Sequence, residues 1–228
     1  MRQLYLRSHL GLGDHIICNG MVRHFAETCT IKMPCKKHNV SSVAYMFSDL
    51  PNVEILPVDN DYMANSLASF LSSKGWEVLM LGQYGQNFNI SENHFDEIFY
   101  RQAHVDYATK WKKFKVPRRL EVEQRLYQNF YGFEGDFAFV HEDSERKYLL
   151  RKELLNSSLP IVRPNKSTDN IFDYCWILEN AAQIDCLDSS FANLADLLEL
   201  KAVVKRIHMY ARPDTVLPLH RQKWEYVK

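Results

Sequence analysis

The sequence lacks long hydrophobic runs, paired-cysteine motifs and an excess of charge of either sign. No apolar run approaches the roughly 20 residues that a membrane-spanning helix needs, so no such helix is expected. The chain carries 28 basic and 28 acidic residues, a formal net charge of zero. Because affinity for a phosphate backbone comes from a surplus of Lys and Arg, this balance excludes a general nucleic-acid binder.

Motifs for disulfides, metals and nucleophilic hydrolysis are also missing. The five cysteines contain no C-x-x-C pair, which favours reduced thiols in a cytoplasmic protein over a disulfide framework or a zinc site. The nine histidines show neither H-x-x-x-H nor H-E-x-x-H spacing, so we predict no metal site and no cofactor. The absence of a G-x-S-x-G elbow leaves a hydrolase triad unsupported.

Strand and helix patterns alternate along the chain, which predicts an α/β fold with parallel sheets. In the first half we expect strands at 4–7, 30–33, 53–58 and 76–81, and helices at 14–27, 37–49 and 61–74. A polar loop at 82–93 and helices at 95–107 and 122–131 follow. In the second half we expect strands at 136–141, 159–163, 183–186 and 202–207, helices at 170–180 and 189–198, and a tail with Pro213, Pro218 and Trp224 that packs on the body.

The two halves predict two Rossmann-like domains, 1–115 and 116–228. Six basic residues and two aromatic residues lie in the stretch from Lys110 to Arg119. We interpret this stretch as a solvated connection between the domains, or as a contact for an anionic surface such as a membrane or a lipid-linked acceptor.

The first expected strand leads into a turn with Gly11 and Gly13, and a helical pattern then opens at Asp14. Glycine permits backbone angles and close approaches that other residues do not. The amides that open the helix would face a ligand at the carboxyl end of the strand. Asp14 stands where its carboxylate could meet a substrate, and the alternative is that it caps the helix. The neighbouring His15 could share its role.

Three short motifs resemble glycosyltransferases of the GT-B fold, in particular the heptosyltransferase-like family 9. They are the turn Gly11–Ile17 with Arg23 in the following helix, the segment Ile184–Ala195, and the turn Phe139–Asp143. In the second motif Asn193 occupies the position where these enzymes carry histidine. The chain is short for this fold.

This resemblance implies two domains that face each other across a cleft, with the acceptor on the side of 1–115 and the nucleotide sugar on the side of 116–228. It also implies metal-independent transfer of a sugar from a nucleoside-diphosphate donor, with Asp14 as the general base that activates an acceptor hydroxyl.

Residues near the expected strand ends are candidates for donor binding. Asp188, Ser189 and Ser190 precede a helix and could hold the diphosphate, or they could simply cap that helix. Basic residues past other strand ends could pair with phosphate or be solvated surface cations. These are Arg146, Lys147, Arg163 and Lys166, of which we select Arg146 and Lys166. His141 and Glu142 could contact the nucleoside, and Gly13 completes the set.

The sequence thus predicts a cytoplasmic glycosyltransferase for glycan biosynthesis, with a nucleotide-sugar donor and a glycan or lipid-linked acceptor. Two alternatives remain: an inactive GT-B-like binding module, and another Rossmann-type enzyme such as a nicotinamide-dependent oxidoreductase. The third glycine of G-x-G-x-x-G is missing after Gly11 and Gly13, which disfavours the oxidoreductase. Asp14→Asn should abolish turnover in a transferase and leave a binding module unaffected.

Overall fold

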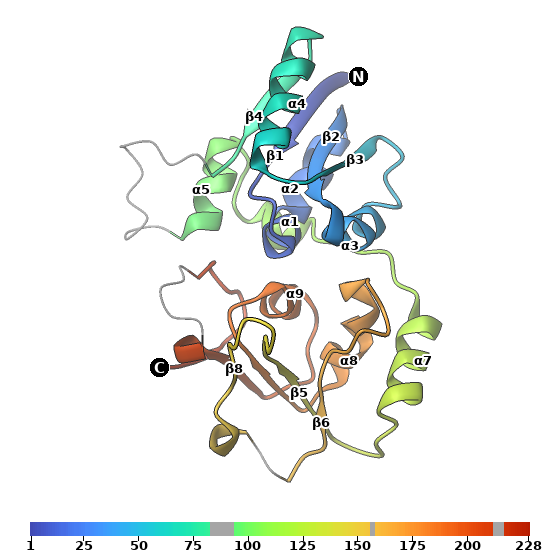
Figure 1. The fold of residues 1–228 in the computed structure, drawn as a ribbon, viewed down its shortest axis with the longest axis vertical. Helices are drawn as coiled ribbons and strands as arrows, with labels where there is room; N and C mark the ends of the chain where they lie inside the picture. Colours follow the sequence, from blue (N-terminus) through green and yellow to red (C-terminus); the bar gives the residue numbers. More distant parts are fainter. Residues whose placement is uncertain (83–93, 156–157, 212–216) are drawn as a thin grey trace. The chain divides into compact units, whose positions relative to one another are not determined.

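The computed structural model describes residues 1–82, 94–155, 158–211 and 217–228. The chain forms two compact units, Met1–Pro117 and Arg118–Lys228, which we call unit 1 and unit 2 (Figure 1). The division falls after residue 117, close to the expected boundary at 115. Each unit is described by itself below.

In the described part of unit 1, four parallel strands form one sheet in the order β3-β2-β1-β4. The strands are β1 (Arg2–Arg7), β2 (Cys29–Lys36), β3 (Val53–Val58) and β4 (Glu77–Met80). Its helices are α1 (Leu12–Ile17), α2 (Asn19–Ala26), η1 (Lys37–Asn39), α3 (Val40–Met46), α4 (Asp61–Ser73), α5 (Phe95–Gln102) and α6 (Thr109–Lys112). Parallel neighbours need crossover connections, which these helices provide.

Short-range contacts define both ends of α4. The side chain of Asn60 accepts a hydrogen bond from the amide of Met63 at 3.0 Å and so caps the helix. Gly75, with φ of 85°, follows its end, a left-handed conformation that glycine adopts without strain. The expected strand at 53–58 is confirmed as β3.

Other helices are shorter than expected. The single helix predicted at 14–27 is divided at Cys18 into α1 and α2, although i to i−4 bonds continue across it, from Cys18 to Asp14 and from Val22 to Cys18. The helix predicted at 95–107 ends at Gln102, because His104 has φ of 53° and cannot continue an α-helix. The periodic apolar pattern does not record such local changes of backbone direction. The expected loop at 82–93 lies outside the described residues beyond Gly82.

Our interpretation of 110–119 as a solvated connection holds only in part: the units divide inside this stretch, but residues 110–117 belong to unit 1. Helix α6 packs against α2 within unit 1, and the side chain of Lys110 is only 3% exposed beside Asp96. The carbonyl of Lys115 accepts hydrogen bonds from Asn19 and Arg23. Internal acidic partners therefore neutralise part of a cluster that composition alone suggested was solvated.

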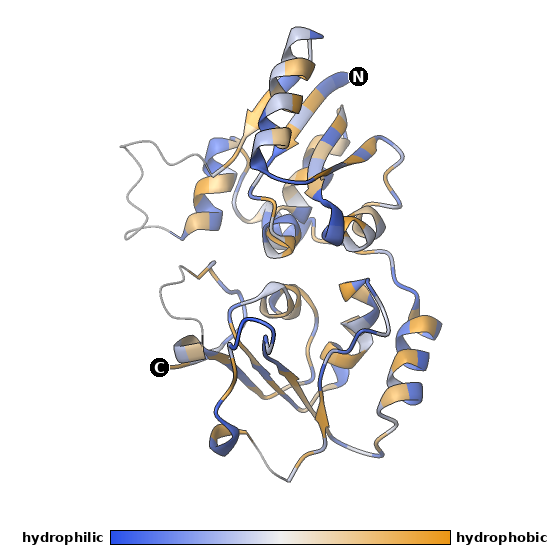
Figure 2. Cartoon of the chain, in the orientation of Figure 1, coloured by the Kyte–Doolittle hydropathy of each residue, from blue (hydrophilic) through white to orange (hydrophobic). Residues whose placement is uncertain are grey.

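In the described part of unit 2, five parallel strands form a sheet in the order β6-β5-β7-β8-β9. The strands are β5 (Ala138–His141), β6 (Ile161–Val162), β7 (Gln183–Cys186), β8 (Val204–His208) and β9 (Glu225–Val227). The helices are α7 (Leu120–Phe130), η2 (Lys152–Leu154), η3 (Ile171–Tyr174), α8 (Cys175–Asn180), α9 (Ser190–Leu197) and η4 (Met209–Ala211). Hydrophilic and hydrophobic residues alternate in bands along α7, as expected of a helix with one buried face (Figure 2).

The tail of unit 2 packs on its body as expected, and it also adds a strand that the sequence did not predict. Trp224 is buried, and its indole donates to Asp196 of α9 at 3.1 Å. Strand β9 then pairs with β8, where Arg206 contacts both Glu225 and Asp185. Pro213 lies outside the described residues.

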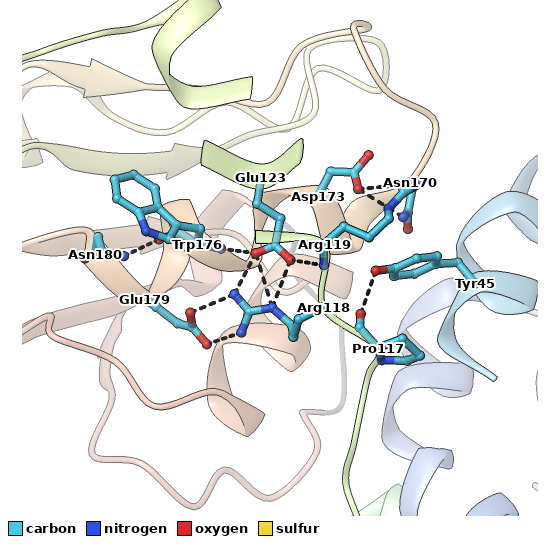
Figure 3. A network of polar contacts seen from close by, with 10 residues as sticks. All are labelled: Tyr45, Pro117, Arg118, Arg119, Glu123, Asn170, Asp173, Trp176, Glu179 and Asn180. Atoms are coloured by element: carbon cyan, nitrogen blue, oxygen red, sulfur yellow. Dashed lines mark hydrogen bonds and ion pairs between the residues drawn. The ribbon is translucent and has the colours of Figure 1, made fainter. Parts of the chain in front are cut away.

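Unit 2 begins with an ion-pair network (Figure 3). The guanidinium of Arg118 donates to both carboxylate oxygens of Glu123 and to both of Glu179. Glu123 also accepts the amide of Trp176 at 3.0 Å, so the network joins α7 to α8. In unit 1, the last residue, Pro117, accepts the hydroxyl of Tyr45 at 2.6 Å.

The expectations about thiols and membrane spans can also be compared with the structure. The five cysteines are all free and buried. Within the described ranges, no helix is both long enough and apolar enough to cross a membrane.

Candidate functional site

Asp14 lies beside the position where the strand order of the first sheet reverses. Strand β1 has β2 on one side and β4 on the other, and ligands of open α/β sheets bind at the carboxyl ends of strands at such a switch point. The chain leaves β1 at Arg7 and enters α1 five residues later. Asp14 is in the first turn of α1, and its side chain is 19% exposed. The carboxylate is therefore held in place but remains accessible.

Asp14 is not the N-cap of its helix. Gly11 occupies the N-cap position in an extended conformation, and no side chain caps α1. A Cβ on Gly11 would lie 2.5 Å from Oδ2 of Asp14, so the carboxylate occupies space that only glycine leaves open. Asp14 therefore does not act as the N-cap of α1, and its carboxylate lies next to Gly11 in the turn.

The two histidines nearest Asp14 have opposite environments. Nδ1 of His9 lies 3.6 Å from Oδ1 of Asp14, and the proximity of this carboxylate raises the pKa of His9. His15 is buried, and burial lowers its pKa to about 4. Neither ring nitrogen of His15 has a hydrogen-bond partner among the described residues. His15 therefore packs as a neutral core residue, while His9, which the sequence did not select, accompanies Asp14.

An Asp-x-Asp triplet, Asp59-Asn60-Asp61, lies between β3 and α4. Asp59 pairs with Lys37 at 2.7 Å, and Asp61 pairs with Arg7. Cations of the chain thus neutralise both carboxylates. In the part of the chain that the structure describes, no group of three or more His, Cys, Asp or Glu side chains could hold a metal ion.

Five of the candidate donor residues meet at the switch point of the second sheet, between β5 and β7. His141 ends β5, and its carbonyl accepts the amide of Leu187, which follows β7, at 3.1 Å. Glu142 continues from β5, while Asp188, Ser189 and Ser190 lead from β7 into α9. The sequence therefore selected two strand ends that are adjacent in the sheet. Gly13, by contrast, lies in α1 of unit 1.

Ser189 caps α9. Its Oγ accepts the amide of Ala192 at 3.4 Å, with Ser189 itself in an extended conformation. The predicted capping role is therefore real, and the first amides of α9 lie at the carboxyl edge of the sheet. Asn193, in the next turn, has a buried Oδ1 with no hydrogen-bond partner in the described residues.

His141 and Glu142 are held by the protein itself. The ring of His141 lies 4.7 Å from that of Phe191, and burial lowers its pKa to about 4, so the imidazole is neutral near pH 7. Oε2 of Glu142 accepts the amide of Leu150 at 3.1 Å. Nε of Arg163, a basic residue that we did not select, lies 3.4 Å from the other oxygen of Glu142.

The two selected cations face the acidic segment after β5. Nε of Arg146 donates to Asp143 at 2.6 Å, and Lys166 pairs with Glu145 at 3.0 Å. The side chain of Lys166 is 94% exposed, and an exposed pair of this kind contributes little stability. A diphosphate would have to compete with these carboxylates for either cation.

Comparisons with known proteins identify solved structures that share the fold of this chain. No protein-family model and no curated protein matches the chain. Among solved structures, a glycosyl transferase of family 9 from Veillonella parvula aligns with 99% of this chain and 86% of its own, with TM-score 0.64 and 10% identity. The ADP-heptose LPS heptosyltransferase II of E. coli aligns with 100% of this chain and 90% of its own, with TM-score 0.60 and 12% identity.

A third structure is the dodecameric, iron-containing heptosyltransferase TibC in complex with ADP-D-β-D-heptose. It aligns with 90% of this chain and 57% of its own, with TM-score 0.53 and 9% identity. The chain thus has the α/β fold with two parallel sheets of GT-B-like glycosyltransferases, and family 9 heptosyltransferases share it.

Proposed function

We propose that this protein is a glycosyltransferase that moves a sugar from a nucleoside-diphosphate donor to an acceptor hydroxyl without a metal ion. The observation that carries the proposal is Asp14, a partly exposed carboxylate at the switch point of unit 1, in a chain with the fold of family 9 transferases. Unit 1 is the acceptor side and unit 2 the donor side.

In the proposed reaction Asp14 takes the proton of the acceptor hydroxyl as general base. The acceptor oxygen forms a bond to the anomeric carbon while the bond from that carbon to the diphosphate breaks. The leaving diphosphate keeps the electron pair and is stabilised by the amides that open α9, with Ser189 and Ser190, and by Arg146 and Lys166 once they exchange their carboxylate partners for phosphate. Asp188 and Gly13 complete the proposed donor contacts.

Glu142 is proposed to bind the ribose hydroxyls of the donor, and His141, neutral at this strand end, to contact the nucleoside. Because the second and third solved structures are named for ADP-heptose, an ADP-linked sugar is the first donor to test. The acceptor class is a glycan or a lipid-linked glycan. Contact with an anionic membrane surface would then fall to exposed residues such as Lys112 and Lys115 and not to buried Lys110. A cytoplasmic location is proposed because all five cysteines are free thiols.

The first experiment is a thermal-shift titration with ADP, GDP, UDP and CDP, each with and without EDTA. At 100 to 1,000 times its dissociation constant, a bound diphosphate should stabilise the protein by roughly 2–4 kcal/mol. Stabilisation by one diphosphate that EDTA leaves unchanged supports a metal-independent donor site. If none of the four stabilises the protein, the donor-site assignment fails.

The second experiment compares Asp14→Asn with Asp59→Asn, a matched change at an exposed ion pair. Release of nucleoside diphosphate from the sugar nucleotide that stabilises the protein should fall about 100-fold or more in Asp14→Asn, with donor affinity retained. Asp59→Asn should retain wild-type turnover. Donor binding with no turnover in the wild type would favour the inactive binding module.

A further inference from the structure

The imidazole of His9 lies between two oxygen acceptors. Its Nδ1 is 3.6 Å from Oδ1 of Asp14, and its Nε2 is 3.3 Å from the carbonyl oxygen of Gly82. A neutral imidazole has one N–H donor, and only the imidazolium has two. Nε2 therefore donates to Gly82, and Nδ1 is within ion-pair range of the Asp14 carboxylate but beyond hydrogen-bond distance. A positively charged ring satisfies both contacts.

Two glycines make room for this pair. A Cβ on Gly11 would lie 2.5 Å from Oδ2 of Asp14, and a Cβ on Gly82 would lie 2.4 Å from Nε2 of His9. Gly82 also has φ of 73°, a conformation that other residues rarely adopt. The side chains of Asp14 and His9 thus occupy space that is open only because residues 11 and 82 are glycines.

Neighbouring elements hold the ring of His9 in place. Phe99 of α5 meets it edge-on at 5.2 Å, and the amide of Gly82 donates to Gln102 of the same helix at 2.8 Å. Together with Asp14, these contacts to His9 come from three parts of unit 1: α1, Gly82 and α5. Since the ring is fixed from several sides, it can impose an orientation on the carboxylate of Asp14.

We propose that His9 is a positioning residue for Asp14: as an imidazolium it holds the carboxylate in one orientation. The role rests on the proposed function of Asp14. Oδ1 faces His9, which leaves Oδ2, over Gly11, to take the proton of the acceptor hydroxyl. His9 keeps its own proton throughout, and the bonds made and broken are those of the transfer described above.

The charged groups around His9 shift its pKa in opposite directions. The carboxylate of Asp14, from α1, raises its pKa, with help from the carbonyl of Gly82. Burial and the charge of Arg7, from β1, lower it. Arg7 is paired with Asp61 of α4, which reduces its effect. Asp14 is therefore the group whose removal should change His9 most.

The pair can be tested without any activity. The imidazole of His9 is titrated by NMR in the wild-type chain, in Asp14→Asn and in Asp59→Asn. We expect the pKa of His9 to fall in Asp14→Asn, because its anionic partner is lost, and to stay at the wild-type value in Asp59→Asn. An unchanged His9 titration in Asp14→Asn would overturn the proposal.

The positioning role is tested with His9→Asn, whose amide can still donate toward Asp14 but carries no charge. Turnover of the nucleotide sugar that stabilises the wild type is measured over a range of donor concentrations, which separates kcat from KM. The variant should lose about 10-fold in kcat with little change in the KM of the donor.

Gly82→Ala provides an independent variant, because its Cβ would displace His9 without removing it. It should also lower kcat with little change in the KM of the donor. A wild-type kcat in both variants would contradict positioning by His9. Absence of turnover in the wild type would instead refute the proposed function, and the positioning role with it, whatever the NMR titration shows.

Discussion

Lys110 and Asp96 form an ion pair in the interior of unit 1, with Nζ and Oδ2 2.7 Å apart and side chains 3% and 0% exposed. Tyr107 donates to the same carboxylate oxygen at 2.6 Å. The ammonium also lies 4.9 Å from the ring centre of Trp111. A buried pair with several partners becomes costly when one member is removed, because the other charge is left without its counterion.

Lys110→Met should therefore destabilise unit 1 by about 3–5 kcal/mol. The matched control is Lys112→Met, which removes a lysine of the same helix whose contact with Asp106 is 4.0 Å long and exposed. That change should cost less than about 1 kcal/mol. Urea unfolding of both variants measures the difference, and equal costs would show that the buried pair contributes no more than the exposed one.

Gly20 is a second sensitive position, because α2 approaches the α6 segment there at backbone distance. A Cβ on Gly20 would lie 2.2 Å from the carbonyl oxygen of Thr109. Gly20→Ala should thus force the two helices apart and cost about 1–3 kcal/mol or more. Gly75→Ala is the comparison: it has a left-handed φ but nothing within 4 Å of its Cβ, so it should cost roughly 1–2 kcal/mol from backbone strain alone. A smaller loss in Gly20→Ala than in Gly75→Ala would contradict the close approach.

Arg118 should be important for the stability of unit 2. Arg118→Met leaves Glu123, whose side chain is 1% exposed, without its guanidinium partner. We expect a loss of about 2–4 kcal/mol and faster amide exchange in α7 and α8, measured by hydrogen exchange and mass spectrometry. Lys201→Met, which breaks an exposed pair with Asp136, should leave exchange in those helices unchanged. Equal protection in the two variants would contradict the role of the network.

His15 should make unit 1 sensitive to acid. Its folded pKa is about 4, below the usual value of 6.5, so between these two values the unfolded chain binds a proton that the folded chain does not. Its contribution is therefore lost as pH falls from 6.5 toward 4, by at most about 1.4 kcal/mol per pH unit. His15→Leu should show a shallower fall in stability over this range, measured by urea unfolding at several pH values. Parallel curves for variant and wild type would contradict the predicted neutral state of His15.

Much of the fold could be predicted because its signals are local. A mostly apolar strand such as Val53–Val58 and an alternating one such as Gln183–Cys186 are marked by neighbouring residues. The alternation of strand and helix then implies parallel sheets. Strand β9 was missed because only three residues form it and two of them are exposed. Pairing with β8, and not hydrophobic pattern, makes it a strand.

The candidate site was predictable only in part, for a related physical reason. Asp14 follows a glycine turn that is visible in the sequence, but the contact between His9 and Gly82 joins residues 73 positions apart. Likewise, nothing near Lys110 in the sequence indicates that Asp96 would bury its charge. Such pairs arise when packing brings distant segments together, and one sequence does not record which charges will meet.

The position of β9 also affects the order in which the chain can fold during synthesis. Unit 1 is complete once Pro117 has emerged from the ribosome, and domains generally fold as units, the N-terminal one first. The sheet of unit 2 has its outermost strand at Glu225–Val227, so it cannot close until residue 227 has been made. Until then β8 is an open edge strand, the kind of surface at which nascent chains aggregate. Newly made unit 2 should therefore depend on chaperones for longer than unit 1.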